Sequence, residues 1–296
     1  MKPTAKPFVK WAGGKSQILD DIRAKYPAGL GVTVTKYAEP FVGGGAVLFD
    51  VLGRYKLDAV YISDINFELI AAYTAIRNNT DTLISFLSEM QIDYWQADEN
   101  TRKIYYYSKR DRFNELKATQ SDSVEIAALF IFLNRTCFNG LYRVNAKGGY
   151  NVPMGSYKKP SICDAENLQS VSDCLQRVQI ICGDYQISRD FIDSNTFAYF
   201  DPPYRPLSET SSFTAYAQDG FGDTEQAQLA RYIDELSDKG AFVIASNSDP
   251  KNTNADDVFF DSLYSKHTIV RVSANRMINS SASGRGKINE LLIASY

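Results

Sequence analysis

Residues 37–64 read YAEPFVGGGAVLFDVLGRYKLDAVYISD, and the fold prediction rests on the pattern of this segment. Residues 37–41 have strand character, three glycines then break the strand, and residues 46–52 have helical character. A second strand is expected at 58–63, and it ends on Asp64. Strand, glycine turn, helix, strand and acid in this order predict a βαβ half-unit of a doubly wound α/β fold.

The alternation of strands and helices continues along the chain but is interrupted in the middle. A helix is expected at 67–77, and residues 81–166 are then mostly helical (83–90, 102–116 and 124–133), followed by a Gly- and Asn-rich stretch at 138–157 with room for a hairpin. Alternation returns with expected strands at 179–182, 197–200 and 241–245, a helix at 224–236, and a closing antiparallel pair at 268–272 and 290–296. We therefore predict an α/β domain in two parts, 1–78 and 166–296, split by a mainly helical insert, 79–165.

The charge of the chain is distributed unevenly. The 296 residues are 44% hydrophobic and 23% charged, which is ordinary for a globular protein, and the net charge of −3 argues against a basic nucleic-acid coat protein. Residues 102–159, however, hold eleven basic and four acidic side chains, a net charge of +7, which leaves −10 for the remainder. This asymmetry predicts a basic binding face on an acidic body.

Several functional classes are excluded or made improbable by composition. The longest apolar run, 127–133, is far shorter than the ~20 residues of a membrane span, and the N-terminal residues lack the apolar stretch of a secretory signal. Four cysteines without a CxxC pair favour a reducing cytoplasm. A single histidine, His267, argues against a zinc site, so we expect no metal, and the absence of a GxSxG motif argues against a serine hydrolase.

The glycine turn predicts a nucleotide ligand. Glycines after a strand allow the backbone to approach a nucleotide closely, and Asp64 stands where an acid accepts hydrogen bonds from ribose hydroxyls. Leu48 occupies the third glycine position of a complete GxGxxG, which favours a smaller adenosine ligand over a dinucleotide. The alternatives are a simple tight turn, and Asp64 as the N-cap of the next helix.

A second motif, Trp11-Ala-Gly-Gly-Lys15, resembles the end of a P-loop, but Val9 stands where that loop requires glycine. We therefore exclude a P-loop nucleotidase. Lys15 is instead expected to neutralise a ligand carboxylate, with Trp11 packing on the apolar part of the ligand. The alternative is a turn with a solvated lysine.

The most specific motif is Asp201-Pro-Pro-Tyr204, directly after the apolar strand at 197–200. The carboxyl end of such a strand borders the ligand crevice of a doubly wound sheet. Two prolines fix the backbone and remove two N–H donors, which leaves the Asp201 carboxylate and the Pro202 carbonyl as acceptors beside the Tyr204 ring. This set suits a planar ring with an exocyclic amine: the acceptors hold the NH₂ and the tyrosine stacks on the ring. The alternative, a proline turn without function, leaves the combination unexplained.

These motifs together resemble the Dam-type DNA adenine-N6 methyltransferases over nearly the whole chain. The resemblance includes further motifs: Leu133-Asn-Arg135, Phe138-Asn-Gly-Leu-Tyr-Arg143, Asn151-Val-Pro153 and Tyr157-Lys-Lys-Pro160, with 206–208, 213–216 and 287–292. It implies a Rossmann-like methyltransferase sheet, S-adenosylmethionine as the cofactor, and an insert that recognises the DNA target. By the same resemblance, the cofactor-binding residues are Trp11, Lys15, Glu39, Phe41, Gly43, Asp64, Asp184 and Asp201, and the catalytic residues are Asp201, Pro202 and Tyr204.

The resemblance and the basic insert together name the residues expected to contact double-stranded DNA. They are Lys10, Arg110, Arg135, Phe138, Asn139, Leu141, Arg143, Pro153, Tyr157 and Lys158. Lys10 and Arg143 are the candidates for base contacts, and Phe138 and Asn139 for the space that a flipped base leaves. For each lysine the alternative is a solvated surface charge, and for Phe138 a core aromatic. Residues 207–222, polar and flanked by glycine, are expected to form a lid.

The expected reaction is methylation of adenine N6 in duplex DNA by base flipping and direct in-line transfer, without metal or covalent intermediate. GATC is the usual site of the family, and a longer site containing GAT is the nearest alternative. Cytosine-N4 methylation is a second enzymatic alternative, and a catalytically dead DNA-binding module is a third reading of the motifs. A cognate restriction nuclease is a possible partner, and the cytoplasm of a bacterial, archaeal or phage-infected cell is the expected location.

Overall fold

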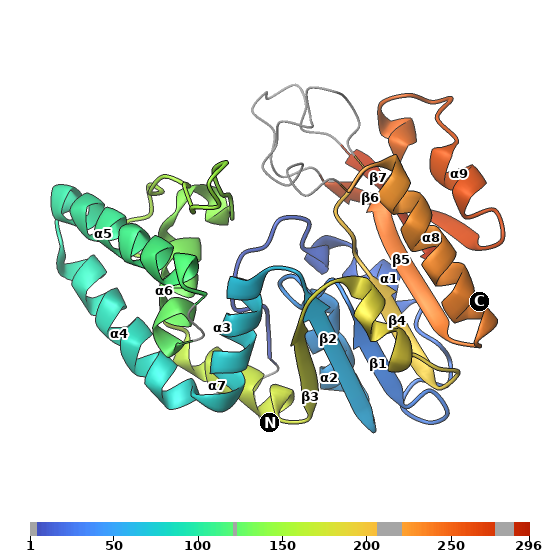
Figure 1. Cartoon of the computed structure of the whole chain (residues 1–296), viewed down its shortest axis with the longest axis horizontal. Helices are drawn as coiled ribbons and strands as arrows, with labels where there is room; N and C mark the ends of the chain where they lie inside the picture. Colours follow the sequence, from blue (N-terminus) through green and yellow to red (C-terminus); the bar gives the residue numbers. More distant parts are fainter. Residues whose placement is uncertain (1–4, 121–122, 206–220, 276–286) are drawn as a thin grey trace. The chain divides into compact units, whose positions relative to one another are not determined.

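The computed structural model of the chain describes residues 5–120, 123–205, 221–275 and 287–296. In this part of the chain seven strands form one sheet, with the order β3-β2-β1-β4-β5-β7-β6 (Figure 1). The strands are β1 (Lys36–Glu39), β2 (Ala59–Asp64), β3 (Val178–Cys182), β4 (Thr196–Phe200), β5 (Phe242–Ser248), β6 (Thr268–Asn275) and β7 (Lys287–Ala294). Strands β1, β2, β4 and β5 are parallel, whereas β7 is antiparallel to both β5 and β6. The predicted doubly wound α/β fold and its closing antiparallel pair are confirmed.

The helices predicted from the sequence are present, most of them with longer ends, and those at Leu19–Arg23, Ala165–Leu175 and Phe259–Leu263 were not predicted. The α-helices of the described residues are α1 (Leu19–Arg23), α2 (Ala46–Arg54), α3 (Phe67–Asn78), α4 (Thr80–Gln96), α5 (Glu99–Ala118), α6 (Val124–Thr136), α7 (Ala165–Leu175), α8 (Asp223–Asp238) and α9 (Phe259–Leu263). Short 3₁₀ turns are η1 (Lys15–Gln17), η2 (Phe138–Gly140), η3 (Tyr185–Asp190) and η6 (Pro250–Asn252). The expected helices of the middle segment correspond to α4, α5 and α6.

The described residues group into two compact units. Unit 1 comprises those of 1–14, 43–54 and 63–183, and unit 2 those of 15–42, 55–62 and 184–296. This grouping cuts across the predicted boundaries at residues 78 and 165, because it follows compactness rather than the order of motifs along the chain. The inserted recognition domain, 79–165, therefore stays a prediction.

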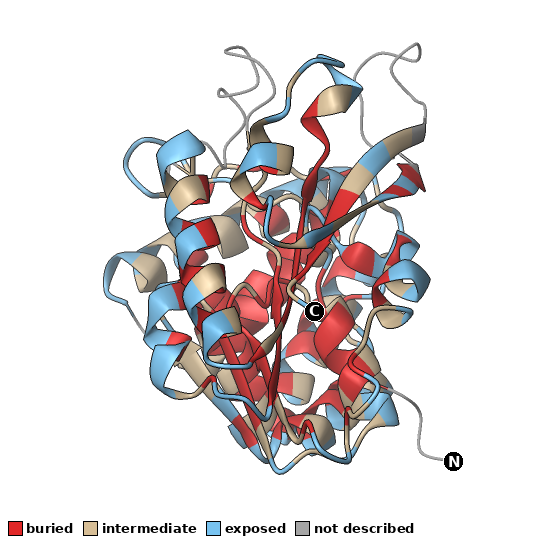
Figure 2. Cartoon of the chain, turned by 90° about the vertical axis from the view of Figure 1, so that its right-hand side faces the viewer, coloured by how far each residue is buried: buried red, intermediate tan, exposed pale blue. Residues whose placement is uncertain are grey.

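The core of unit 2 is built from apolar parallel strands. All five residues of β4 are buried, and so are six of the seven residues of β5. Figure 2 shows the central strands of the sheet as a mainly buried layer. A strand covered on both faces has no polar side to alternate with, so an uninterrupted apolar run such as Phe197–Phe200 is what such a position requires. Asp201 directly follows the last residue of this buried strand.

The core of unit 1 is built around α6. Ten of its thirteen residues are buried, and the helix packs against α3, α4 and α5. A helix that is apolar on all sides is stable only when other helices surround it, and α6 satisfies this condition. The stretch after it contains no strand. Two isolated antiparallel bridges, Cys137 to Met154 and Val144 to Tyr150, take the place of the expected hairpin.

The proposed lid, 207–222, lies almost entirely outside the described residues, as do the motif residues at 206–208 and 213–216. Within the described ranges, no helix combines the length and the apolar character that crossing a membrane requires.

Candidate functional site

Asp201 is held in place at the carboxyl end of β4 by two polar partners. Its Oδ2 lies 2.6 Å from the Lys15 Nζ, and its Oδ1 accepts a hydrogen bond of 2.9 Å from the Ser246 hydroxyl. Ser246 belongs to β5, the strand parallel to β4, and its oxygen is also 3.0 Å from the Tyr199 hydroxyl. The carboxylate therefore has a fixed orientation, and each oxygen keeps a lone pair beyond those used here.

Lys15 is buried beside Asp201. Only 3% of its side chain is exposed, so the solvated-lysine alternative is wrong. Its ammonium pairs with Asp201 and also lies 4.9 Å from the centre of the Tyr204 ring. A buried ammonium is stable only with a charged or aromatic partner, and here it has both. Lys15, Asp201 and Tyr204 thus form one contact group within unit 2.

Tyr204 has a partner that sequence reasoning missed. Its hydroxyl donates a 2.7 Å hydrogen bond to the Glu290 carboxylate on β7. Burial raises the pKa of Tyr204 well above its ordinary value, and the neighbouring charges of Asp201 and Glu290 add to this effect. The phenol is therefore a hydrogen-bond donor at physiological pH and does not act as a base. The only sequence signal for Glu290 was its place in the stretch 287–292.

The backbone of the proline pair is also supported. Gln226 of α8 donates to the Pro203 carbonyl at 3.0 Å, and the Asn247 amide donates to Gln226 at 3.2 Å. Arg205 binds Asp223 with two nitrogens, at 2.6 and 3.0 Å, and Asp257 with a third at 2.7 Å. No sequence pattern signalled these supports, because they join residues 18 to 52 positions apart. They fix the direction of the chain as it leaves Tyr204.

Three other predicted cofactor residues of unit 2 occupy distinct surroundings. Glu39, at the end of β1, is buried and accepts a 2.6 Å hydrogen bond from Tyr37. Phe41 stacks on Tyr185, with ring centres 5.4 Å apart. Asp184 is exposed and caps η3 by accepting from the Gln186 amide at 2.9 Å. Glu39 and Phe41 lie at the carboxyl end of β1, whereas Asp184 lies at the start of η3.

In unit 1 the structure brings together Trp11, the glycine turn and Asp64. The Gly43 amide donates to the Asp64 Oδ2 at 3.1 Å, and the Asn66 amide donates to Oδ1 at 2.9 Å. Gly43 has a φ of +48°, and a Cβ there would lie 2.8 Å from the Trp11 ring, so only glycine fits. The N-cap of α3 is Asn66, which accepts from the Leu69 amide, so the alternative of Asp64 as that cap is wrong.

The Asp64 carboxyl is electrostatically unusual. Burial raises its pKa to about 6, although hydrogen bonds from the Asn66, Gly43 and Ile65 amides act in the opposite direction. A carboxylate that is destabilised by burial gains most from a ligand that donates hydrogen bonds. The two hydroxyls of a ribose are donors of this kind, and the side-chain set at this turn fits them.

Lys10 and the loop that follows α6 are joined by one buried amide. Asn134 accepts from the Lys10 amide at 2.7 Å, and its NH₂ donates to the carbonyls of Lys10 and Gly140 at 2.8 and 3.1 Å. The Lys10 ammonium lies 3.2 Å from the Tyr157 hydroxyl and 4.3 Å from the centre of its ring. Phe138 in this loop is 52% exposed, so the core-aromatic alternative is wrong.

The remaining predicted DNA residues of unit 1 divide into exposed and engaged side chains. Asn139, Arg143, Pro153 and Lys158 are exposed, and Leu141 is partly exposed. Asn151 orients Arg143 by accepting from its Nε at 2.7 Å. Arg110 lies over the Tyr107 ring at 4.5 Å. Exposure places the first group where a duplex can reach them.

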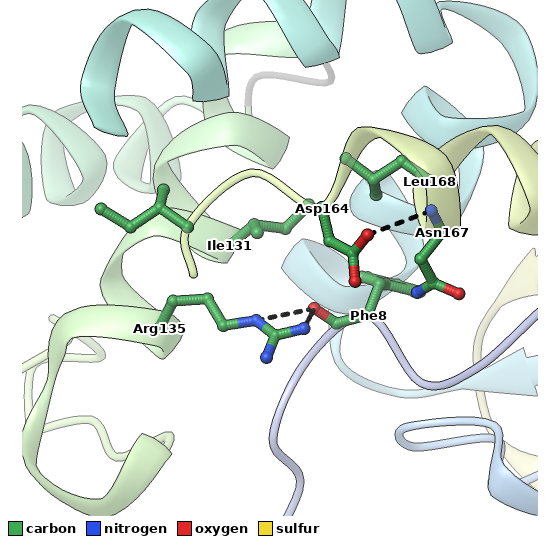
Figure 3. A pocket seen from close by; sticks show the side chains of 7 residues that line it. Phe8, Ile131, Arg135, Asp164, Asn167 and Leu168 are labelled. Carbon is green, nitrogen blue, oxygen red and sulfur yellow. Dashed lines mark hydrogen bonds between the residues drawn. The ribbon is translucent and has the colours of Figure 1, made fainter. Parts of the chain in front are cut away.

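Arg135 has a structural contact of its own. Two of its nitrogens donate to the Phe8 carbonyl, at 3.2 and 2.7 Å, and it lines a small pocket with Asp164 and Asn167 (Figure 3). Figure 3 also shows the Asp164 carboxylate bonded to the Asn167 amide. The pocket holds none of the predicted cofactor residues, so we assign no ligand to it.

The surroundings of Trp11 extend toward the same loop. Its ring packs on Tyr142, with ring centres 5.9 Å apart, and the Tyr142 hydroxyl donates to buried Glu68 at 2.7 Å. Lys117 of α5 binds the other oxygen of Glu68. Sequence reasoning missed Glu68 because an acid within a helix carries no distinctive pattern. Tyr142 belongs to the motif at 138–143, but no role was assigned to it.

Sequence comparisons give the chain its relatives. A sequence model of the D12 class of N6 adenine-specific DNA methyltransferases matches residues 11–278. The type II methyltransferase M.MjaIII of Methanocaldococcus jannaschii is 48% identical, over 98% of this chain and 99% of the relative. The DNA adenine methylases of Vibrio cholerae and Escherichia coli K12 are 37% and 35% identical, each over 97% of this chain and over 95% and 94% of the relative.

Proposed function

Since the chain belongs to the D12 class of N6 adenine-specific DNA methyltransferases and uses S-adenosylmethionine, we propose that it methylates the adenine of GATC in duplex DNA. The observation that carries the proposed site is the contact group of Asp201, Lys15 and Tyr204 at the end of β4. The GATC proposal is supported by the resemblance to Dam-type enzymes and by the exposed positions of Lys10 and Arg143. A longer site containing GAT is the alternative, because a few loop side chains determine which bases are recognised.

In each unit, the proposed cofactor residues fit the chemistry of part of S-adenosylmethionine. Bound S-adenosylmethionine supplies an electrophilic methyl group on a sulfonium centre. Asp64 accepts hydrogen bonds from the ribose, Gly43 allows close approach of the backbone, and Trp11 offers an apolar ring. Lys15 is proposed to neutralise the carboxylate of S-adenosylmethionine. The remaining members of the proposed set are Glu39, Phe41, Asp184 and Asp201.

Asp201 and Pro202 are proposed to hold the amine that receives the methyl group. The N6 lone pair is delocalised into the adenine ring, so the amine is a weak nucleophile. Hydrogen bonds from its two N–H groups to the Asp201 carboxylate and the Pro202 carbonyl favour a tetrahedral nitrogen with a localised lone pair. Gln226 binds the carbonyl of Pro203 and not that of Pro202, which supports this assignment. Positioning of this kind is worth ~7–11 kcal/mol.

Base flipping is part of the proposal because N6 of a paired adenine lies inside the duplex. Tyr204 stacks on the flipped base, and Phe138 and Asn139 occupy the space left behind. Backbone and base-edge contacts come from the other proposed DNA residues: Lys10, Arg110, Arg135, Leu141, Arg143, Pro153, Tyr157 and Lys158. Arg135 keeps a structural contact with Phe8, so we expect it to contribute least to DNA binding among these residues.

The cellular setting is proposed from the relatives. M.MjaIII is named a type II methyltransferase, and we propose that this chain likewise protects DNA against a cognate restriction nuclease in the cytoplasm of a bacterium, an archaeon or a phage-infected host. Disruption of the chain's gene in its own host tests this idea. Loss of viability only when a neighbouring nuclease gene is intact supports it, and unaffected growth contradicts it.

The recognition site is tested by single-base methylation mapping of DNA from cells that express the protein. The expected result is N6-methyladenine at GATC, together with protection of GATC plasmids from a methylation-sensitive nuclease. Methylation at only a subset of GATC sites with common flanking bases indicates the longer site. Methyl groups on cytosine N4, or none at all, contradict the proposal.

A further inference from the structure

We propose that Glu290 is a positioning residue of methyl transfer, which holds the Tyr204 hydroxyl and so fixes the position of the ring that stacks on the target base. The inference deepens the proposed function and rests on it, because it requires Tyr204 to contact the flipped adenine. Glu290 itself is expected to touch neither substrate nor cofactor. Its effect on the reaction passes entirely through Tyr204.

The contact has the geometry of a strong hydrogen bond. The Tyr204 hydroxyl lies 2.7 Å from a carboxylate oxygen of Glu290, and Tyr204 is itself only partly exposed. Hydrogen bonds to an ionised acceptor are shorter and roughly twice as strong as neutral ones. A tyrosine ring turns about two side-chain bonds, and its hydroxyl oxygen lies on the axis of the second. A fixed hydroxyl therefore fixes the first angle, and with it the position of the ring.

Glu290 is itself rigidly mounted. It lies on β7, where it is opposite Ser248 of β5 on one side and Val272 of β6 on the other. The next three residues of the strand, Leu291–Ile293, are buried. Because this strand is paired on both edges, two ladders of backbone hydrogen bonds fix the Cα of Glu290, and the side chain reaches Tyr204 from a fixed point of the backbone.

The ring is then held at two places within unit 2. Glu290 holds the hydroxyl, and the Lys15 ammonium lies over the ring, 4.9 Å from its centre. Lys15 is in turn bound to Asp201, the acceptor for the amine. Lys15 therefore supports both the Tyr204 ring and the Asp201 carboxylate. If Glu290 is removed, Lys15 alone orients the ring, and the base that stacks on it loses its alignment with Asp201.

The experiment uses Glu290→Ala, Glu290→Gln and Tyr204→Phe in the full chain, with Glu235→Ala as the control. Glu235 is an exposed acid of the same unit. We expect Glu290→Ala to lower the single-turnover rate of methyl transfer at saturating DNA and cofactor by roughly tenfold, the scale of a small misplacement. KM for both substrates is expected to stay within about twofold, since Glu290 binds neither. Glu290→Gln retains an acceptor and is expected to restore most of the rate.

A double-mutant cycle separates this role from a merely structural one. In the Tyr204→Phe background the hydroxyl is absent, so Glu290→Ala is expected to have no further effect. An undiminished additional loss in that background overturns the proposal, as does a wild-type rate for Glu290→Ala or an equal loss for Glu290→Gln. If Glu290→Ala does not fold, Tyr204→Phe removes the same hydrogen bond from the other side and must show the same loss of rate.

Failure of the inference and failure of the proposed site have different signatures. If Tyr204→Ala leaves methyl transfer intact, Tyr204 does not hold the base and the proposed site is wrong. If Tyr204→Ala abolishes transfer but Glu290→Ala does not lower it, only the positioning role is wrong. A duplex with 2-aminopurine at the target position gives a second readout, because poorer stacking on Tyr204 leaves its fluorescence brighter in Glu290→Ala than in the wild type.

Discussion

At the scale of the residue, Asp201 uses the same two oxygens for its structural contacts and for the proposed binding of the amine. It accepts from Ser246 and pairs with Lys15 in the structure, and the proposed reaction adds the amine of the target base. A carboxylate offers about four acceptor positions, so all three partners fit. The pairing with Lys15 orients the carboxylate before substrate arrives. The prolines after it limit how the acceptor can move.

Replacement of Asp201 by alanine is expected to abolish methyl transfer while DNA binding survives. The variant loses the acceptor for the amine but none of the proposed DNA contacts. Tritiated methyl transfer and gel-shift titration measure the two properties. Because Lys15 is left buried without its partner, Asp201→Asn is the matched variant for a fold check, and exposed Glu235→Ala is the control. Substantial turnover in Asp201→Ala would falsify the catalytic assignment.

Asp64 predicts a pH dependence of cofactor binding. Its pKa of about 6 lies above the ordinary value, so the group becomes protonated as the pH falls through 6 and then no longer accepts two hydroxyls. We expect the Kd for S-adenosylmethionine to be about tenfold weaker at pH 5 than at pH 8, because one pH unit below a pKa leaves about a tenth of the group ionised. Calorimetric titration across this range measures it.

The same group sets the sign of a stability change. A carboxyl whose pKa is raised on folding lowers stability as the pH rises from its unfolded value, near 3.8, through 6. Asp64→Asn removes the ionisation and is expected to flatten both the binding profile and the stability profile. A binding profile that keeps its shape in Asp64→Asn assigns the titration to another group.

At the scale of the element, α6 is both the centre of a helical core and the support of a loop. Its last turn carries Asn134, whose amide joins the N-terminal segment at Lys10 to the loop at Gly140. One side chain thus holds two segments that are expected to face DNA. The motif Leu133-Asn-Arg135 was visible in the sequence. The structural role of Asn134 was not, because its two partners are backbone groups of Lys10 and Gly140.

Asn134→Ala is expected to lower stability by about 2–4 kcal/mol, since it leaves buried backbone groups without partners. It is also expected to weaken discrimination between GATC and altered sites, because Lys10 and the loop lose their common support. Guanidinium unfolding and competition gel shifts measure the two effects. Asn134→Asp keeps the acceptor for the Lys10 amide and is expected to be milder. If Asn134→Ala is destabilised but still discriminates GATC from altered sites as the wild type does, Asn134 contributes to folding alone.

The elements themselves were predictable from local pattern, whereas the supports of the site were not. Residues 37–64 show a strand, a glycine turn, a helix and a second strand in sequence, and β1, α2 and β2 form as expected. Asp201 and Tyr204 were recognisable because their motif is continuous. The pairing of Lys15 with Asp201 joins residues 186 positions apart, and Tyr204 with Glu290 joins residues 86 positions apart. Only tertiary packing determines such pairs.

At the scale of the whole molecule, the uneven charge predicts how binding depends on salt. Lys158 is exposed and belongs to the segment of net charge +7, whereas Lys239 is exposed in the acidic remainder. We expect Lys158→Ala to reduce the slope of log K against log salt by about 0.9, the value for one phosphate contact, and Lys239→Ala to leave it unchanged. Fluorescence anisotropy at several salt concentrations checks this. Equal slopes for both variants place the DNA face elsewhere.

The position of β7 in the sheet has a consequence for how the enzyme is made. Synthesis proceeds from the N-terminus, so β4, Asp201 and Tyr204 leave the ribosome long before residue 290. Until β7 enters between β5 and β6, both of those strands present open edges and the tyrosine lacks its acceptor. Unfinished chains therefore carry the basic segment, 102–159, before Tyr204 has its acceptor. We therefore expect the full rate of methyl transfer only from chains whose translation has passed β7.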